Sequence, residues 1–110
     1  MSLEKQRCTA CTPETPRISE EEARKLLTQV PGFDLAGDGT RISRTFRFAN
    51  YYETMAFVNA VAFIAHREDH HPDLEVHYRT CTVTYSTHAI SGLSMNDFIC
   101  AAKVNALLEA

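Results

Sequence analysis

Residues 80–87 of the chain, TCTVTYST, give its clearest β-strand signal. β-Branched and aromatic side chains dominate the segment, and these residue types are enriched in strands. Because successive side chains of a strand point to opposite faces, the segment presents two rows of side chains. One row is Cys81, Val83, Tyr85 and Thr87, and the other is Thr82, Thr84, Ser86 and His88.

Outward from this strand, capping signals mark where helices begin. Ser19 and Asn50 each stand three residues before a Glu, and Ser94 stands three residues before an Asp, a spacing typical of helix N-termini. Hydrophobic periodicity and turn residues then set the remaining limits. They predict helices over about 20–30, 51–69 and 95–108, and further strands over 33–36, 42–48 and 74–78.

The predicted order is helix, strand, strand, helix, strand, strand, helix. It indicates an α+β fold with a four-stranded, mainly antiparallel sheet and the helices packed on one face. The other sheet face is then open to water, a ligand or another subunit.

The long helix over 51–69 is apolar around more than one narrow stripe. Its apolar residues include Met55, Phe57, Val58, Val61, Phe63 and Ile64. A helix of this kind is usually covered on more than one side. We therefore expect the sheet on one side and a second subunit on another, in a homodimer or homotetramer.

Length and charge restrict the class of protein. The 110 residues suffice for one core, so we predict a polar N-terminal leader over 1–17 and a single domain over 18–110. The net charge is −3 and the cationic residues form no stripe, so no nucleic-acid partner is expected. No apolar stretch approaches the roughly 20 residues that span a bilayer, and no signal peptide is visible. These features predict a cytoplasmic protein without a membrane partner.

Two of the four cysteines, Cys8 and Cys11, form a C-x-x-C pair in the leader. A zinc site of this type usually has two more ligands at matching spacing, and the chain has no second C-x-x-C. We therefore expect free thiols in a mobile tail. An occasional metal or an adventitious disulfide is the alternative.

Histidines carry the strongest chemical signal. His66, His70 and His71 stand at the end of the long helix, and His88 follows the strand over 80–87. The unperturbed pKa of a histidine side chain is about 6.5, so clustered histidines suit proton transfer at neutral pH. The fifth, His77, stands alone on a predicted strand and is expected to be partly exposed and structural.

Three other interpretations of these histidines compete with acid–base catalysis. The first is a surface cluster without a role. The second is a zinc site on a helix, since His66 and His70 have the i, i+4 spacing of two zinc ligands on one helical face. The metalloprotease motif requires Glu after the first His, where this chain has Arg67, so no functional metal is expected. The third is nucleophilic catalysis by Ser86 or Cys81 with a histidine base, for which no orienting partner is evident.

Asp97 has two interpretations. As the third residue of the last helix, its carboxylate favours the helix dipole and the N-terminal amides. It could also reach the histidines and orient an imidazole. The sequence leaves both open.

Several of these residues, taken with their spacings, resemble the pterin-4a-carbinolamine dehydratase family. The matching positions are His66, the run His70-His71-Pro72, the aromatic Tyr78 six residues after the proline, His88 ten residues further on, and then Asp97. The order of predicted elements matches the family fold over about residues 18–108.

The resemblance implies a 4a-hydroxytetrahydrobiopterin dehydratase, a hydro-lyase. Such an enzyme removes water from a 4a-hydroxytetrahydropterin to give a quinonoid dihydropterin, in pterin recycling for aromatic amino-acid hydroxylation. The resemblance implies general acid–base catalysis by His70, His71 and His88, without metal or cofactor. It also implies a set of substrate-binding or orienting residues: His66, Asp69, Pro72, Ser86, Thr87 and Asp97.

One position departs from the common family pattern. His66 stands where Glu is frequent, so an orienting carboxylate would have to come from Glu68 or Asp69. The resemblance also implies two alternative roles: a protein-binding, coactivator-like dimerisation module, and a step in the pterin metabolism of the molybdenum cofactor.

Overall fold

The computed structural model describes residues 2–109 of the chain and contains a four-stranded sheet with three α-helices. The α-helices are α1 (Glu20–Leu26), α2 (Tyr51–Glu68) and α3 (Met95–Ala106), and the strands are β1 (Asp34–Leu35), β2 (Ile42–Arg47), β3 (Asp73–Val76) and β4 (Thr80–Tyr85). Three 3-10 turns complete the chain: η1 (Leu3–Lys5), η2 (Leu27–Gln29) and η3 (His88–Ile90).

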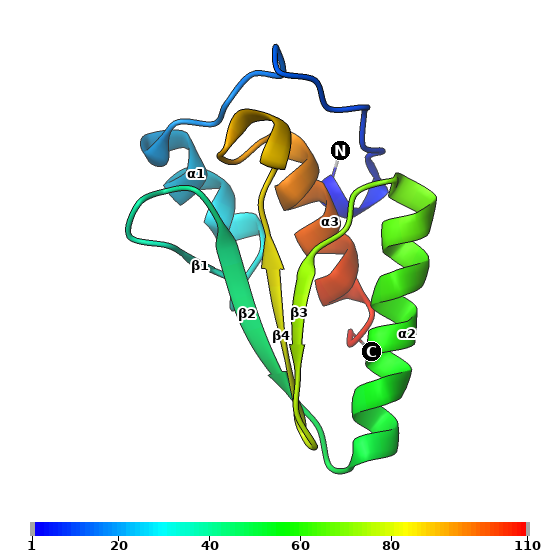
Figure 1. The fold of residues 1–110 in the computed structure, drawn as a ribbon. Helices are drawn as coiled ribbons and strands as arrows, with labels where there is room; N and C mark the ends of the chain where they lie inside the picture. The colour runs from blue at the N-terminus through cyan, green and yellow to red at the C-terminus, as the bar shows by residue number, and fades with distance from the viewer. Residues whose placement is uncertain (1, 110) are drawn as a thin grey trace.

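The sheet is antiparallel throughout, with the strand order β1-β2-β4-β3. Figure 1 shows α1, α2 and α3 on the same side of this sheet. The predicted α+β class, the order of elements and the helices on one face are therefore confirmed.

The strand over 80–87 lies at the centre of the sheet. The side chains of Cys81, Val83 and Tyr85 on β4 are completely buried, and the residues between them are only partly covered. The buried row packs against apolar side chains of α2 and α3, including Phe57 and Phe98. Burying each large apolar side chain contributes about 1.5–3 kcal/mol, so the alternation seen in the sequence decides which sheet face holds the core.

Several strand limits differ from the prediction because backbone pairing ends earlier than the β-propensity does. β4 ends at Tyr85, and Thr87 instead pairs with Gly92 in an isolated bridge that closes the next loop. β3 ends at Val76, and the amide of His77 donates to the carbonyl of Thr80 across the turn into β4.

The leader packs against α3, a contact that its polar composition does not predict. Leu3 is buried in the core, and η1 contacts α3. Figure 1 shows the leader passing over the end of the molecule where η3 and the N-terminus of α3 lie. No helix within residues 2–109 has both the length and the apolar character needed to cross a bilayer.

Candidate active site

His70 is placed by the way in which α2 ends. Asp69, the residue after the helix, adopts the left-handed conformation (φ 52°, ψ 43°), and its amide donates to the carbonyl of Ala65. This conformation turns the chain out of the helix, so His70 lies beyond α2. The Nε2 of His70 donates to Oδ1 of Asp97 over 2.7 Å. The His70 side chain is 10% exposed and the Asp97 side chain 0% exposed.

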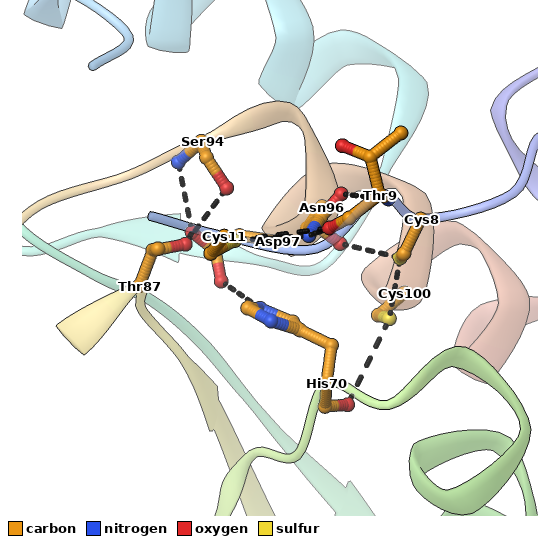
Figure 2. A network of polar contacts seen from close by, with 9 residues as sticks. All are labelled: Cys8, Thr9, Cys11, His70, Thr87, Ser94, Asn96, Asp97 and Cys100. Carbon is orange, nitrogen blue, oxygen red and sulfur yellow. Dashed lines mark hydrogen bonds and ion pairs between the residues drawn. The ribbon is translucent and has the colours of Figure 1, made fainter. Parts of the chain in front are cut away.

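Asp97 is held by the first turn of α3 and by the end of β4. Its second oxygen, Oδ2, accepts from the backbone amide of Ser94 over 2.9 Å and from Oγ1 of Thr87 over 2.7 Å. The hydroxyls of Thr87 and Ser94 also lie 2.7 Å apart, which completes the buried network in Figure 2. Asp97 therefore bonds both the Ser94 amide at the start of α3 and the ring of His70, so its carboxylate makes the contacts that each of the two interpretations requires.

His71 and His88 form a second, exposed pair beside this network. Their ring centroids lie 6.3 Å apart, and both residues are exposed. Pro72 disfavours helical geometry at His71, while η3 carries His88. A hydroxyl oxygen between rings at this spacing can lie within hydrogen-bonding distance of a nitrogen of each ring.

A pocket of about 250 Å³ opens next to His88. Its lining comes from the end of β4, the following loop and the β1–β2 connection: Thr40, Arg41, Ser86, Thr87, His88, Ser91 and Gly92. All of these residues except Gly92 have a polar group in the side chain. The side chain of Arg17 lies over Gly92, where an added Cβ would be 2.4 Å from Nε of Arg17.

Tyr85 supports the ring of His70 from the sheet side. The two rings are stacked, with centroids 6.0 Å apart and an interplanar angle of 8°. The Tyr85 hydroxyl is buried and has no hydrogen-bond partner among the described residues. Burial, with a smaller contribution from the nearby cysteines, raises the pKa of the Tyr85 phenol far above its usual range. Tyr85 is thus a neutral, planar support.

Of the predicted site residues, His70, His71, Pro72, Ser86, Thr87, His88 and Asp97 lie at this end of the sheet. His66 is exposed on α2, and Asp69 is exposed at its C-terminus. The prediction that His66 and His70 share a helical face is wrong, because the left-handed residue at Asp69 takes His70 off the helix. The zinc-helix interpretation, which depends on that face, fails with it.

Glu68, one of the two residues suggested as a substitute for the carboxylate missing at position 66, bonds the leader and not a histidine. Its buried carboxylate accepts from the amide of Cys8 over 2.9 Å and lies 3.0 Å from Nε of Arg7. Burial opposes ionisation, but the Cys8 amide, Arg7 and Lys103 outweigh it, so the pKa of Glu68 lies below its usual range. Glu68 anchors the leader.

Tyr78 and His77 lie outside the site. Tyr78 is exposed and stacks on Tyr51, with centroids 6.0 Å apart. His77 is exposed, as expected, and pairs with Glu75 over 3.0 Å.

Within residues 2–109, no three His, Cys, Asp or Glu side chains are grouped in a way that could hold a metal ion.

Sequence reasoning missed Arg41, Thr40 and Tyr85 as neighbours of the site. Arg41 precedes β2, and the register that pairs Ile42 with Tyr85 brings it beside Ser86. The turn signal before β2 locates the hairpin but not its register against β4. The stacking of Tyr85 on His70 likewise depends on a contact between distant parts of the chain.

Comparison with known sequences points to one family. The sequence model described as pterin 4 alpha carbinolamine dehydratase matches residues 16–107. A protein of Nitrosomonas eutropha is 58% identical over 107 residues, which cover 96% of this chain and 93% of the relative. A protein of Xanthomonas campestris is 57% identical over 107 residues, which cover 97% of this chain and 91% of the relative. Both carry the name "Putative pterin-4-alpha-carbinolamine dehydratase".

Solved structures agree with this result. The crystal structure of a transcriptional coactivator/pterin dehydratase from Brucella melitensis has a TM-score of 0.81 at 29% identity, covering 86% of this chain and 100% of that chain. A pterin dehydratase-like protein, identified as a RuBisCO assembly factor in the alpha-carboxysome, has a TM-score of 0.63 at 22% identity. The match covers 73% of this chain and 93% of that chain. The second likeness shows the fold alone.

Proposed function

The chain belongs to the pterin 4 alpha carbinolamine dehydratase family, and from this premise we propose that it dehydrates a 4a-hydroxytetrahydropterin to a quinonoid dihydropterin. The observation that most supports this proposal is the buried His70–Asp97 pair beside the exposed rings of His71 and His88. The arrangement offers imidazoles in two different environments within one site.

The chemistry requires an acid and a base. Hydroxide is a poor leaving group, so the 4a oxygen takes a proton as its bond to carbon breaks, and it departs as water. The neighbouring ring nitrogen supplies the electron pair for the new C=N bond and gives up its proton to a base. The substrate is neither oxidised nor reduced. Each positioned proton-transfer group contributes about 10²–10⁴-fold to such a reaction.

His70 is suited to act as the base. Because Asp97 accepts a hydrogen bond from Nε2, the neutral imidazole carries its free lone pair on Nδ1. The carboxylate therefore fixes which nitrogen can accept a proton, in the way that an orienting carboxylate fixes a catalytic histidine. Asp97 is a positioning residue, and Thr87 fixes it in turn through the bond to Oδ2.

His88 is the proposed acid, and His71 is proposed to place the pterin. His88 lines the polar pocket, so it can meet a substrate hydroxyl there. His71 lies close enough to contact the same oxygen or the adjacent ring. Ser86 also lines the pocket and would hydrogen-bond the substrate. Asp69 and Pro72 are proposed to act indirectly, since they set the backbone conformation that places His70 and His71. A role for His66 stays a prediction.

The test follows the decay of 4a-hydroxytetrahydropterin near neutral pH with and without the protein. The native chain is expected to accelerate the decay, and the His70→Ala/His88→Ala variant to lose at least about 100-fold of that acceleration. His77→Ala is the matched control, since His77 is exposed and distant from the site. A double variant as active as the native chain would overturn the assignment.

Physiological setting is a separate part of the proposal. We place the reaction in cytoplasmic pterin recycling for aromatic amino-acid hydroxylation, with pterin metabolism of the molybdenum cofactor as the alternative. Both rest on family membership. A gene for an aromatic hydroxylase beside this gene would favour the first.

A protein-binding role is the second candidate function. Tyr52 and Phe63 on α2 are strongly exposed within the single chain, and the Brucella relative is described as a transcriptional coactivator as well as a pterin dehydratase. We expect self-association, in a homodimer or homotetramer, to cover this helix. Sizing the pure protein over a range of concentrations tests this, because a monomer at every concentration would favour a different partner.

A further inference from the structure

The leader is clamped to the first turn of α3 by a single side chain, Asn96. Its Oδ1 accepts from the amide of Thr9 over 3.1 Å, and its Nδ2 donates to the carbonyl of Thr9 over 2.6 Å. The same Nδ2 lies 3.1 Å from Sγ of Cys11. A third contact is made by the thiol of Cys8, whose Sγ lies 3.7 Å from the carbonyl of Asn96. This paired bonding holds the backbone of Thr9, the residue after Cys8, and the Glu68 carboxylate holds the amide of Cys8 itself.

The clamp brings two thiols from opposite ends of the chain together. Sγ of Cys8 lies 3.4 Å from Sγ of Cys100, although 92 positions separate them in sequence. Cys100 is completely buried on α3, and Cys8 is partly exposed in the leader (Figure 2). We propose that Cys8 and Cys100 form an oxidisable dithiol site, in which a small organic disulfide converts the two thiols into an intramolecular disulfide.

The geometry favours Cys100 over Cys11 as the partner of Cys8. Cys8 and Cys11 form the C-x-x-C pair, but the Cys11 thiol faces the Asn96 amide and the carbonyl of Thr9. A disulfide needs an S–S distance of about 2.05 Å, so the Cys8 and Cys100 sulfurs must approach by roughly 1.4 Å. Cys8 lies in no α-helix or strand, so the approach of the two sulfurs has to stretch only the hydrogen bonds that hold Cys8 and Thr9.

The reaction is a thiol–disulfide exchange in two steps. Cys8, the exposed member, attacks one sulfur of the small disulfide as its thiolate, and one small thiol leaves. The sulfur of Cys100 then attacks Sγ of Cys8, the bond from Sγ of Cys8 to the small thiol breaks, and the proton of Cys100 passes to the departing sulfur, which leaves as the second small thiol. The protein loses two protons and two electrons, and the small disulfide is reduced to two thiols.

The order of the steps follows from the two environments. The hydrogen bond to Cys8 and burial raise the pKa of the Cys100 thiol far above its usual range, so Cys100 keeps its proton in the reduced protein. Burial also denies Cys100 to the small disulfide. It reacts only with a sulfur that is already beside it.

Oxidation joins the leader covalently to the helix that carries Asp97. Cys100 lies one helical turn after Asp97 on α3, and its Sγ lies 4.0 Å from the carbonyl of His70. The dithiol site does not depend on the proposed dehydratase activity. It gives a function to two cysteines that the catalytic site leaves unused.

The test exposes the folded native chain to mixtures of reduced and oxidised glutathione and reads the products by intact mass and peptide mapping under non-reducing conditions. We expect the loss of two hydrogens, no retained glutathione and a cross-linked peptide that contains Cys8 and Cys100. Cys11→Ser is the matched control and should give the same cross-link, whereas Cys8→Ser should give none.

A cross-link between Cys8 and Cys11, or a stable glutathione adduct on Cys8, would overturn the proposal. Thermal unfolding gives an independent reading. A cross-link over 92 positions should raise the midpoint of the native chain by roughly 15–30 °C and leave Cys8→Ser unchanged. A midpoint unchanged by oxidation would contradict a disulfide at this place in the fold.

Discussion

Two histidine–carboxylate pairs lie within residues 2–109, and they differ in burial far more than in distance. His70 and Asp97 lie 2.7 Å apart with side chains 10% and 0% exposed. His77 and Glu75 lie 3.0 Å apart with side chains 65% and 74% exposed. Only Asp97 has further donors, Ser94 and Thr87, on its second oxygen. Solvent competes for the exposed pair, whereas packing and additional bonds hold the buried one in a single geometry.

The comparison teaches that residue type and proximity do not separate the proposed catalytic histidine from a surface histidine. What distinguishes His70 is a carboxylate that is itself fixed by other groups. The predictions below disturb the buried pair or its supports and use the exposed pair, or another exposed contact, as the control.

Removal of the buried carboxylate should have the largest effect. Asp97→Ala leaves the Thr87 hydroxyl and the Ser94 amide without their acceptor and breaks the bond to His70. We expect the free energy of unfolding to fall by about 3–5 kcal/mol. Glu75→Ala should change it by less than about 0.5 kcal/mol. Denaturant titration of both variants measures the difference, and equal losses would show that burial is not the distinguishing feature.

Loss of the supporting hydroxyl should have the next largest effect. Thr87→Val removes the donor to Asp97 and the partner of Ser94 while keeping the shape of the side chain. We expect the free energy of unfolding to fall by about 1–3 kcal/mol, because buried polar groups lose a hydrogen-bond partner. Thr82→Val is the control, since its hydroxyl bond to Thr45 is exposed. Equal changes measured by denaturant titration would remove Thr87 from the positioning network.

Acidic pH should remove the stability that a different buried carboxylate, that of Glu68, contributes to the fold. Its folded pKa lies below the usual value of 4.5, so its ionised form stabilises the protein above that pH. This stability is lost as the pH falls below 4.5 and through the folded pKa. Glu68→Gln should therefore flatten the acid side of the stability–pH curve, with exposed Glu21→Gln as the control. An unchanged curve would mean that Glu68 does not anchor the leader by its charge.

The smallest expected effect is a gain. The Tyr85 hydroxyl is buried without a partner among the described residues, so Tyr85→Phe removes a desolvated group and keeps the ring that stacks on His70. Stability should rise by roughly 1 kcal/mol in thermal or denaturant unfolding. The decay rate of 4a-hydroxytetrahydropterin should stay unchanged. A clear loss of stability would show that the hydroxyl has a partner after all.

Local patterns predicted much of the fold. Ser19 and Asn50 accept hydrogen bonds from the third residue of their helices, as the capping signals indicated. The alternation over residues 80–87 divided the side chains correctly into two rows, of which Cys81, Val83, Tyr85 and Thr87 form the buried one. These features depend on neighbours in sequence, so propensity and periodicity are sufficient to find them.

Long-range features were not predictable in the same way. The place of Arg41 depends on the register between β2 and β4, and the Glu68 bond to the leader joins residues 60 positions apart. The i, i+4 spacing placed His66 and His70 on one face, because no composition signal shows that Asp69 is left-handed. Pairings of this kind are set by the packed core.

The most direct test of the central claim compares His70→Gln with His77→Gln in the decay of 4a-hydroxytetrahydropterin near neutral pH. The account predicts that the first substitution lowers kcat/KM by about 10²–10⁴-fold, and that the second leaves it unchanged. Similar rates for the two variants would contradict the claim that the histidine held by the buried Asp97 carries the reaction.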